Sequence, residues 1–157
     1  MRLFHGTRCE FSTPELDKCR KHKDFGQGFY LTENKKMAEN WAKKQDSTIG
    51  PILVNIYEID DKIFTSGELN VKIFEANREW VEFVYNNRED EYFTHPYDIV
   101  IGPVADRELQ KHFAKIQRGE KAFEDIVEDI HYNKFKGMQY CFCSAEAISK
   151  LIMYDRH

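Results

Sequence analysis

Apolar and polar residues alternate in several short stretches, and this pattern predicts strands spread along the chain. The strongest stretch, residues 51–59, is rich in β-branched side chains and predicts a central strand. Two small strands are expected at residues 63–64 and 71–74. Further strands are expected near both ends and in the second half of the chain, at residues 3–7, 29–32, 97–102 and 137–142.

Between these stretches, apolar residues recur at intervals of three and four, which predicts helices. Thr32 is expected to cap the first helix, which carries Ala38 and a core Trp41 on its apolar stripe and ends near Lys44. The polar residues 8–23 instead predict a loop, with at most one helical turn at 15–18. Later helices are expected at residues 77–87, 106–116, 119–132 and 145–152.

Strands gathered from both ends of the chain, with helices between them, indicate an α+β fold. A wound parallel sheet is disfavoured, because the sequence lacks regular strand-helix alternation and a Gly-x-Gly-x-x-Gly turn. The length of 157 residues suits one domain with a buried core. Residues 1–157 are therefore predicted to form a single domain.

Composition narrows the class of protein. Hydrophobic residues make up 41% of the chain and charged residues 32%, as in globular proteins, and no apolar run is long enough to span a membrane. The N-terminal residues lack the pattern of a secretory signal, so we expect the protein in the cytoplasm, with no membrane partner. A net charge of -4 argues against a broad nucleic-acid-binding surface. A local basic cluster between Lys18 and Lys23 is either a contact patch or, more simply, a solvated loop.

The four cysteines predict no metal site. No Cys-x-x-Cys pair is present. Cys141 and Cys143 stand two residues apart in a predicted strand, so they share one face and are expected as small buried side chains. Free thiols fit a reducing compartment.

Residues 24–32 are the segment around which the candidate site is organised. Gly26 and Gly28 allow a close approach of backbone to a ligand and lead directly into an aromatic strand. Tyr30 should face the opposite side from its two neighbours, so one face of this strand is expected in the core and the other free for a ligand. The alternative is an ordinary glycine-rich hairpin or bulge leading into a core strand.

Two further motifs, one near each end of the chain, belong with this segment. His5-Gly6-Thr7 ends the first strand, and Met138-Gln139-Tyr140 lies near the C-terminus. Together with the segment from Gly26 to Thr32 and the helix carrying Ala38 and Trp41, they resemble the diphtheria-toxin and poly(ADP-ribose) polymerase branch of the ADP-ribosyltransferases. The chain more closely resembles an uncharacterised bacterial, toxin-like domain family of this fold, often encoded beside a small partner protein, for which residues 97–106 are typical. The resemblance implies a split β-sheet core with surrounding helices.

The resemblance also implies NAD as the co-substrate and assigns residues to it. His5 would bond the adenosine-side ribose, and the backbone of Gly6 would hold the nicotinamide amide. Thr7 and Gly28 belong to the same NAD-binding set. Tyr30 would stack on nicotinamide, where an aromatic face supports the pyridinium charge. The alternative for His5 is a core histidine bonded to backbone.

Gln139 marks a departure from the better-studied enzymes, which carry a glutamate at this position. A glutamine can orient the nicotinamide-side ribose, but it cannot act as a base or supply charge. Asp24 is therefore the first candidate for a catalytic carboxylate, ahead of Asp98 and Glu146, which are more simply a buried acceptor and a helix N-terminal charge. Four residues on or after one helix are either contacts to phosphate or target or, more simply, a solvated helix face: Asn77, Arg78, Asn87 and Arg88.

Three functions remain open at this stage. The first is mono-ADP-ribosyl transfer from NAD to a protein or nucleic-acid target, as in a toxin-like effector that a small antitoxin-like partner restrains. The second is a module of the same fold that binds NAD, ADP-ribose or a partner without turnover. The third is NAD hydrolysis.

Overall fold

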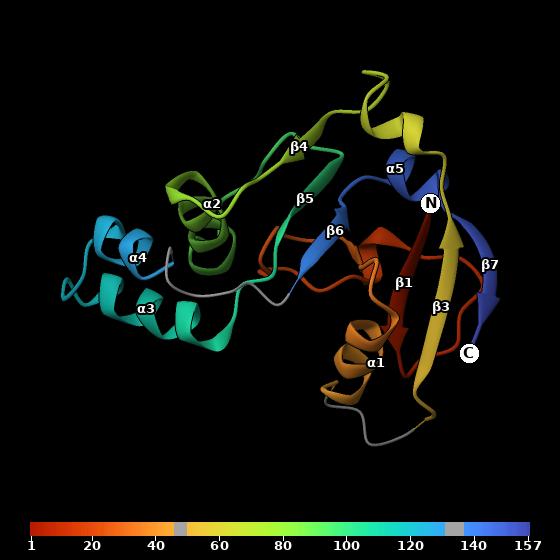
Figure 1. Ribbon diagram of the computed structural model, residues 1–157, viewed down its shortest axis with the longest axis horizontal. Helices are drawn as coiled ribbons and strands as arrows, with labels where there is room; N and C mark the ends of the chain where they lie inside the picture. Colours follow the sequence, from red (N-terminus) through yellow and green to blue (C-terminus); the bar gives the residue numbers. More distant parts are fainter. Residues whose placement is uncertain (46–49, 131–136) are drawn as a thin grey trace.

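The computed structural model describes residues 1–45, 50–130 and 137–157 (Figure 1). These residues form a mixed α+β structure. The strands are β1 (Arg2–Thr7), β2 (Phe29–Leu31), β3 (Leu53–Glu58), β4 (Val71–Ile73), β5 (Ile99–Pro103), β6 (Met138–Phe142) and β7 (Ile152–Arg156). The α-helices are α1 (Lys35–Lys43), α2 (Arg78–Glu89), α3 (Arg107–Gln117), α4 (Phe123–Ile130) and α5 (Ala145–Ser149).

The strands form two sheets. The first has the order β1-β3-β7 and is antiparallel throughout. The second has the order β2-β6-β5-β4, in which only the edge pair β4-β5 is parallel among the described strands. Reciprocal backbone hydrogen bonds of 2.8 and 3.0 Å between Phe4 and Thr32 join the two sheets. The sheets therefore meet where β1 passes the end of β2.

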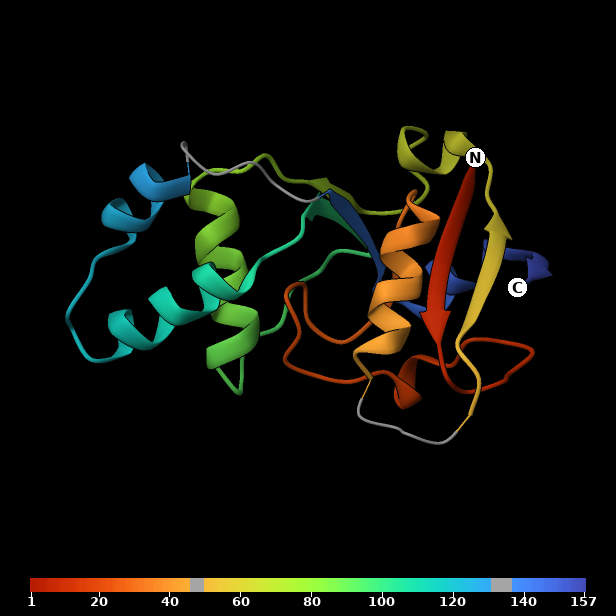
Figure 2. The ribbon, with the colours of Figure 1, turned by 60° about the horizontal axis from the view of Figure 1, so that its bottom comes forward.

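Helices cover the two sheets in different ways. Helix α1 lies along β1 (Figure 2), while α2, α3 and α4 gather at the far end of the molecule, beyond β4 and β5 (Figure 1). The approach of α1 depends on Gly6, because a Cβ at this position would lie only 1.8 Å from the Ala38 carbonyl oxygen. A glycine is required there by close packing.

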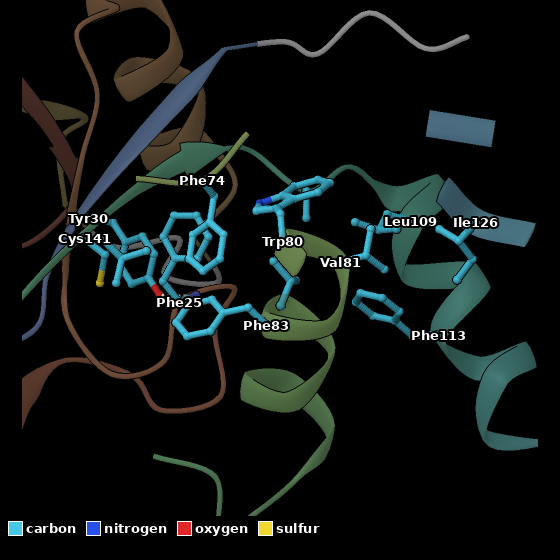
Figure 3. Packing of buried hydrophobic residues seen from close by; sticks show 13 residues of the cluster. Phe25, Tyr30, Phe74, Trp80, Val81, Phe83, Leu109, Phe113, Ile126 and Cys141 are labelled. Carbon is cyan, nitrogen blue, oxygen red and sulfur yellow. Dashed lines mark hydrogen bonds between the residues drawn. The ribbon is translucent and has the colours of Figure 1, made fainter. Parts of the chain in front are cut away.

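Two hydrophobic clusters form the core. The first joins Phe25, Tyr30 and Cys141 to the three distal helices through Trp80 and Phe113 (Figure 3). The second fills the space between the two sheets and includes residues of both, namely Leu3, Phe29, Leu31, Tyr57, Ile99, Ile101, Tyr140 and Phe142. Both faces of β2 are therefore covered by core.

Several sequence predictions need correction. The helix cap is Asn34, whose side chain accepts from the Met37 N–H, while the Thr32 hydroxyl bonds Asn34 N. The pair 63–64 belongs to a 3₁₀ helix, Asp61–Phe64, because the Asp60 carboxylate caps that turn. The last predicted helix stops at Ser149, and residues beyond it form β7 on the free edge of β3.

The other boundaries agree to within a few residues. A 3₁₀ turn, Leu16–Lys18, lies where a single helical turn was expected. The helix predicted over 119–132 begins only at Phe123, and residues 131–132 of that prediction lie outside the described residues. None of the helices in the described ranges is long and apolar enough to cross a membrane.

Candidate functional site

His5 lies at the junction between the two sheets. Its Nδ1 is 2.7 Å from the Tyr30 carbonyl oxygen, and its ring stacks on Phe29 with centroids 4.0 Å apart. A carbonyl oxygen only accepts, so Nδ1 carries the proton and Nε2 keeps its lone pair. Burial lowers the pKa of His5 to about 4 and keeps the ring neutral at pH 7. His5 therefore presents an acceptor to any group that reaches Nε2, with Phe11 packed edge-on at 5.9 Å.

Gly6 and Thr7 are held by local contacts. The Gly6 carbonyl accepts from the Gln45 side chain at 3.2 Å, and α1 covers its Cα. The Thr7 hydroxyl accepts from Cys9 N at 3.0 Å and lies within 3.2 Å of Cys9 O, which turns the chain at the end of β1. Both residues shape the first turn of the loop over 8–23.

Gly26 and Gly28 are each required by the local structure, for different reasons. Gly26 has a φ of +83°, which side chains rarely adopt. At Gly28, a Cβ would lie 2.3 Å from Cys141 Sγ and 2.9 Å from the Phe142 carbonyl oxygen. The tight turn and the close approach of β2 to β6 therefore account for both glycines without a ligand, but the segment is not a hairpin, because β2 pairs with the distant β6.

Tyr30 does not present a free face. Its side chain is 5% exposed, and its hydroxyl donates to Gly26 O at 2.6 Å and accepts from Phe25 N at 2.9 Å. Burial raises the pKa of Tyr30 well above its ordinary value. The Lys23 ammonium lies 4.4 Å from the ring centroid. The expectation of an open face on β2 was wrong, because the second sheet has core on both sides of this strand.

Asp24 and Gln139 are brought into direct contact. Gln139 Nε2 donates to Asp24 Oδ2 at 2.9 Å, and Ala105 N donates to the same oxygen at 3.2 Å. The other oxygen, Oδ1, accepts from Arg88 Nε at 2.6 Å and Nη2 at 2.5 Å. Asp24 is 6% exposed and Gln139 4% exposed. A loop, α2, the end of β5 and β6 thus converge on one buried carboxylate.

Arg88 was missed by the sequence analysis, which expected it on a solvated helix face. Its guanidinium instead pairs with Asp24. Its inward position could have been predicted from helical spacing. Arg88 follows the buried Val81 and Val84 by seven and four residues, so it lies on the same inward-facing stripe of α2. Asn87 on the same helix is also buried, and donates to Phe83 O at 2.9 Å. Asn77 caps α2, and Arg78 pairs with Glu82 at 2.8 Å.

The lesser candidates lie apart from this network. Asp98 accepts from Asn70 N at 2.8 Å, as expected of a structural acceptor. Glu146 is exposed in the first turn of α5. In the basic cluster, Lys18 pairs with Glu15 at 2.9 Å on the surface. The described parts of the chain contain no group of three or more His, Cys, Asp or Glu side chains that could hold a metal ion.

The predicted site residues thus fall into two groups. Tyr30 and Gln139 belong to adjacent strands, and both Tyr30 and its register partner Cys141 pack in the cluster that contains Phe25. His5 contacts the backbone of Tyr30 and the ring of Phe29, on the side of the second cluster. The Tyr30 carbonyl is the direct link between His5 and the strand that carries the aromatic ring.

The chain belongs to the family described as protein of unknown function (DUF3990), whose model matches residues 1–153. No curated protein and no solved structure matches the chain.

Proposed function

We propose that this member of the family is a mono-ADP-ribosyltransferase of the ADP-ribosyltransferase fold, with NAD as its co-substrate. The proposal starts from the resemblance of the three motifs, and the contact between His5 and Tyr30 supports it, because it joins the first two motif strands at one place. The third motif residue, Gln139, lies on β6, which pairs directly with β2.

The hydrogen bond between Gln139 and Asp24 is the observation that carries the proposal. A glutamine alone has no charge with which to stabilise a positively charged transition state. Here a carboxylate lies 2.9 Å from the amide nitrogen. The role that a single glutamate has in the better-studied enzymes is therefore divided between an amide, which orients the ribose, and a neighbouring carboxylate, which supplies charge.

The proposed reaction breaks the bond between the ribose C1 and the nicotinamide nitrogen. The electron pair leaves with nicotinamide, the ribose becomes oxocarbenium-like, and a nucleophile of the target forms the new bond at C1 and releases its proton to water. Gln139 donates to Asp24 and Pro103 through its amide nitrogen, so its carbonyl oxygen is the group that orients a ribose hydroxyl. Asp24 stabilises the developing positive charge.

The remaining NAD contacts follow from the same geometry. Neutral His5 accepts a hydrogen bond from a ribose hydroxyl through Nε2. The Tyr30 ring is buried beneath the Lys23 ammonium, so its stacking on nicotinamide requires the Lys23 side chain and the loop around it to move away first. The acceptor is a protein or nucleic acid held over the loop 8–23, because this loop follows His5 directly and has a basic end between Lys18 and Lys23. A small antitoxin-like protein restrains the enzyme, and this part rests on the family resemblance alone.

A module that binds NAD, ADP-ribose or a partner without turnover is the second candidate. The hydrogen bonds of Asp24 favour this candidate, because both carboxylate oxygens already accept from Arg88, Ala105 and Gln139. A carboxylate so fully bonded also suits a purely structural role. Transfer, hydrolysis and binding without turnover differ in their products, so one experiment distinguishes them.

That experiment incubates the pure protein with adenine-labelled NAD in cell lysate and follows both free nicotinamide and labelled macromolecules. Label that protease or nuclease digestion releases supports transfer, and nicotinamide without labelled macromolecule indicates hydrolysis. Binding by calorimetry without nicotinamide release indicates the non-catalytic module. Asp24→Asn should abolish release, whereas the exposed Glu146→Gln should behave as the wild type. No binding at millimolar NAD would overturn transfer, hydrolysis and the NAD-binding module, and would leave only a module that binds ADP-ribose or a partner.

A further inference from the structure

Two cysteine thiols lie in contact at the end of β6. Cys141 Sγ and Cys143 Sγ are 3.1 Å apart. Cys141 is completely buried beside Tyr30 (Figure 3), whereas Cys143 is only half-buried, just beyond the strand. The pair forms no part of the proposed NAD site, and both thiols are free.

The surroundings make the two sulfurs chemically different. The hydrogen bond with the Cys141 thiol, reinforced by His95, lowers the pKa of Cys143 to about 6. Burial raises the pKa of Cys141 well above its ordinary value. His95 is held in place on both sides, since Nε2 is 2.8 Å from Phe25 O and Nδ1 accepts from Tyr97 N at 3.2 Å. The more accessible Cys143 is therefore the more acidic thiol of the pair and lies in contact with the buried Cys141, an arrangement that favours thiol oxidation.

We propose that Cys141 and Cys143 are a peroxide-sensitive pair that closes to a reversible disulfide. The sulfurs need to approach from 3.1 Å to about 2.05 Å. Two residues of extended chain span about 6.7 Å between Cα atoms, which is near the upper limit of about 6.8 Å for a disulfide. A bridge at this limit is of the labile kind that thiols readily reopen.

The reaction needs one equivalent of hydrogen peroxide as oxidant. The Cys143 thiolate attacks a peroxide oxygen, the O–O bond breaks, and hydroxide leaves, so that Cys143 becomes a sulfenic acid. The Cys141 sulfur then attacks the Cys143 sulfur, the S–O bond breaks, and the hydroxyl leaves as water with the Cys141 proton. Two thiols are oxidised to one disulfide, and one peroxide is reduced to two waters.

Oxidation of the cysteine pair would directly affect the packing of β2. Cys141 is the register partner of Tyr30, and its sulfur fills the space that a Cβ at Gly28 would need. Moving that sulfur toward Cys143 loosens the contact that holds Gly28 against β6. The pair thus lies where a change at one sulfur alters the packing of the aromatic strand.

The test uses a Cys9→Ser, Cys19→Ser variant of the full chain, which keeps only the pair. After one equivalent of hydrogen peroxide at pH 7, the tryptic peptide 137–150 should have lost two hydrogen atoms, resist iodoacetamide, and recover both thiols with dithiothreitol. An unmodified peptide, a sulfinic acid at Cys143, or a covalent dimer would overturn the proposal.

Two further variants show which cysteine reacts first with peroxide. In the same background, Cys141→Ser should leave a Cys143 sulfenic acid that dimedone traps, and Cys143→Ser should abolish the reaction. Trapping at Cys141 instead would reverse the assigned roles and contradict the proposal. The wild-type chain should give the same bridge, so a disulfide between Cys19 and Cys143 would also contradict it. Circular dichroism before oxidation controls for folding.

Discussion

The Lys23 ammonium lies over the ring of Tyr30, 4.4 Å from its centroid. This is the aromatic face that the proposed function assigns to the positively charged nicotinamide ring. If NAD binds as proposed, this cation of the chain itself competes with the cation of the co-substrate for the same ring face.

Removing this competitor should strengthen NAD binding. A cation over a tyrosine at such a site contributes about 0.5–1 kcal/mol, so Lys23→Met should lower the Kd for NAD roughly two- to fivefold. Isothermal titration calorimetry measures the change. The exposed Lys21→Met removes an equal charge from the same loop and is expected to leave the Kd within error; equal effects of both variants would show only a general electrostatic contribution.

Gln139→Ala should reduce turnover more than it reduces NAD affinity. In the proposed reaction this side chain orients a ribose hydroxyl at the reacting centre, so its loss removes an interaction that is strongest in the transition state. Nicotinamide release and calorimetry give the two quantities separately. Gln117→Ala, on an exposed part of α3, is the matched control. A parallel loss of affinity and turnover would mean that Gln139 contributes to binding alone.

Gln139→Glu is expected to destabilise the protein as pH rises. The change places a second carboxylate beside Asp24, where the glutamine now donates at 2.9 Å. Repulsion from the neighbouring carboxylate raises the folded-state pKa of the introduced carboxyl, so the folded variant binds more protons than its unfolded chain. The free energy of unfolding, taken relative to the wild type at the same pH, should then be higher at pH 5 than at pH 8. Urea denaturation at both values measures it, and a flat profile would show that Arg88 neutralises the added charge.

Arg88→Met should destabilise the fold by about 3 kcal/mol, because it leaves the buried Asp24 carboxylate without its counter-charge. Arg78→Met removes an arginine from the same helix, but its partners Glu82 and Glu124 are exposed, so the cost is expected below about 1 kcal/mol. Urea denaturation compares the two. Equal costs would mean that the Asp24 pair is no more important than a surface pair.

Because of His5, we expect the free energy of unfolding to fall in mild acid. Its folded-state pKa of about 4 lies below the ordinary value near 6.5, so the unfolded chain binds the proton first. The stabilisation is complete above about pH 6.5 and falls by up to about 3 kcal/mol as pH drops toward 4. His5→Asn should flatten the curve over this range, while the exposed His22→Asn should not. An NMR titration of the His5 ring with a midpoint near 6.5 would contradict the assignment.

The sequence was sufficient for the α+β class and for most strands and helices, because apolar periodicity and caps such as Asp106 and Ser144 are local signals. It missed β7, whose partner β3 lies about a hundred residues earlier, since edge pairing of that kind leaves little local trace. Residues 63–64, which end the 3₁₀ helix Asp61–Phe64, were taken for a strand because so short an apolar pair carries no clear period.

The candidate site was also predicted only in part from the sequence. The motif residues His5, Tyr30 and Gln139 were selected from sequence, and so was Asp24. Their partners were not, because the contacts of Arg88 and the Ala105 N–H with Asp24 bridge 64 and 81 residues. The burial of Tyr30 was also missed, since alternation within β2 says which way a side chain points but not whether another layer covers it.

The convergence on Asp24 has a consequence for the lifetime of the folded state. Its hydrogen bonds with residues 88, 105 and 139 bridge 64, 81 and 115 residues. Contacts of such separation close long loops, so we expect them to form after the local helices and turns. Interactions absent from the transition state act on the unfolding rate rather than the folding rate. We therefore expect the buried carboxylate to slow the unfolding of the native protein without speeding its folding.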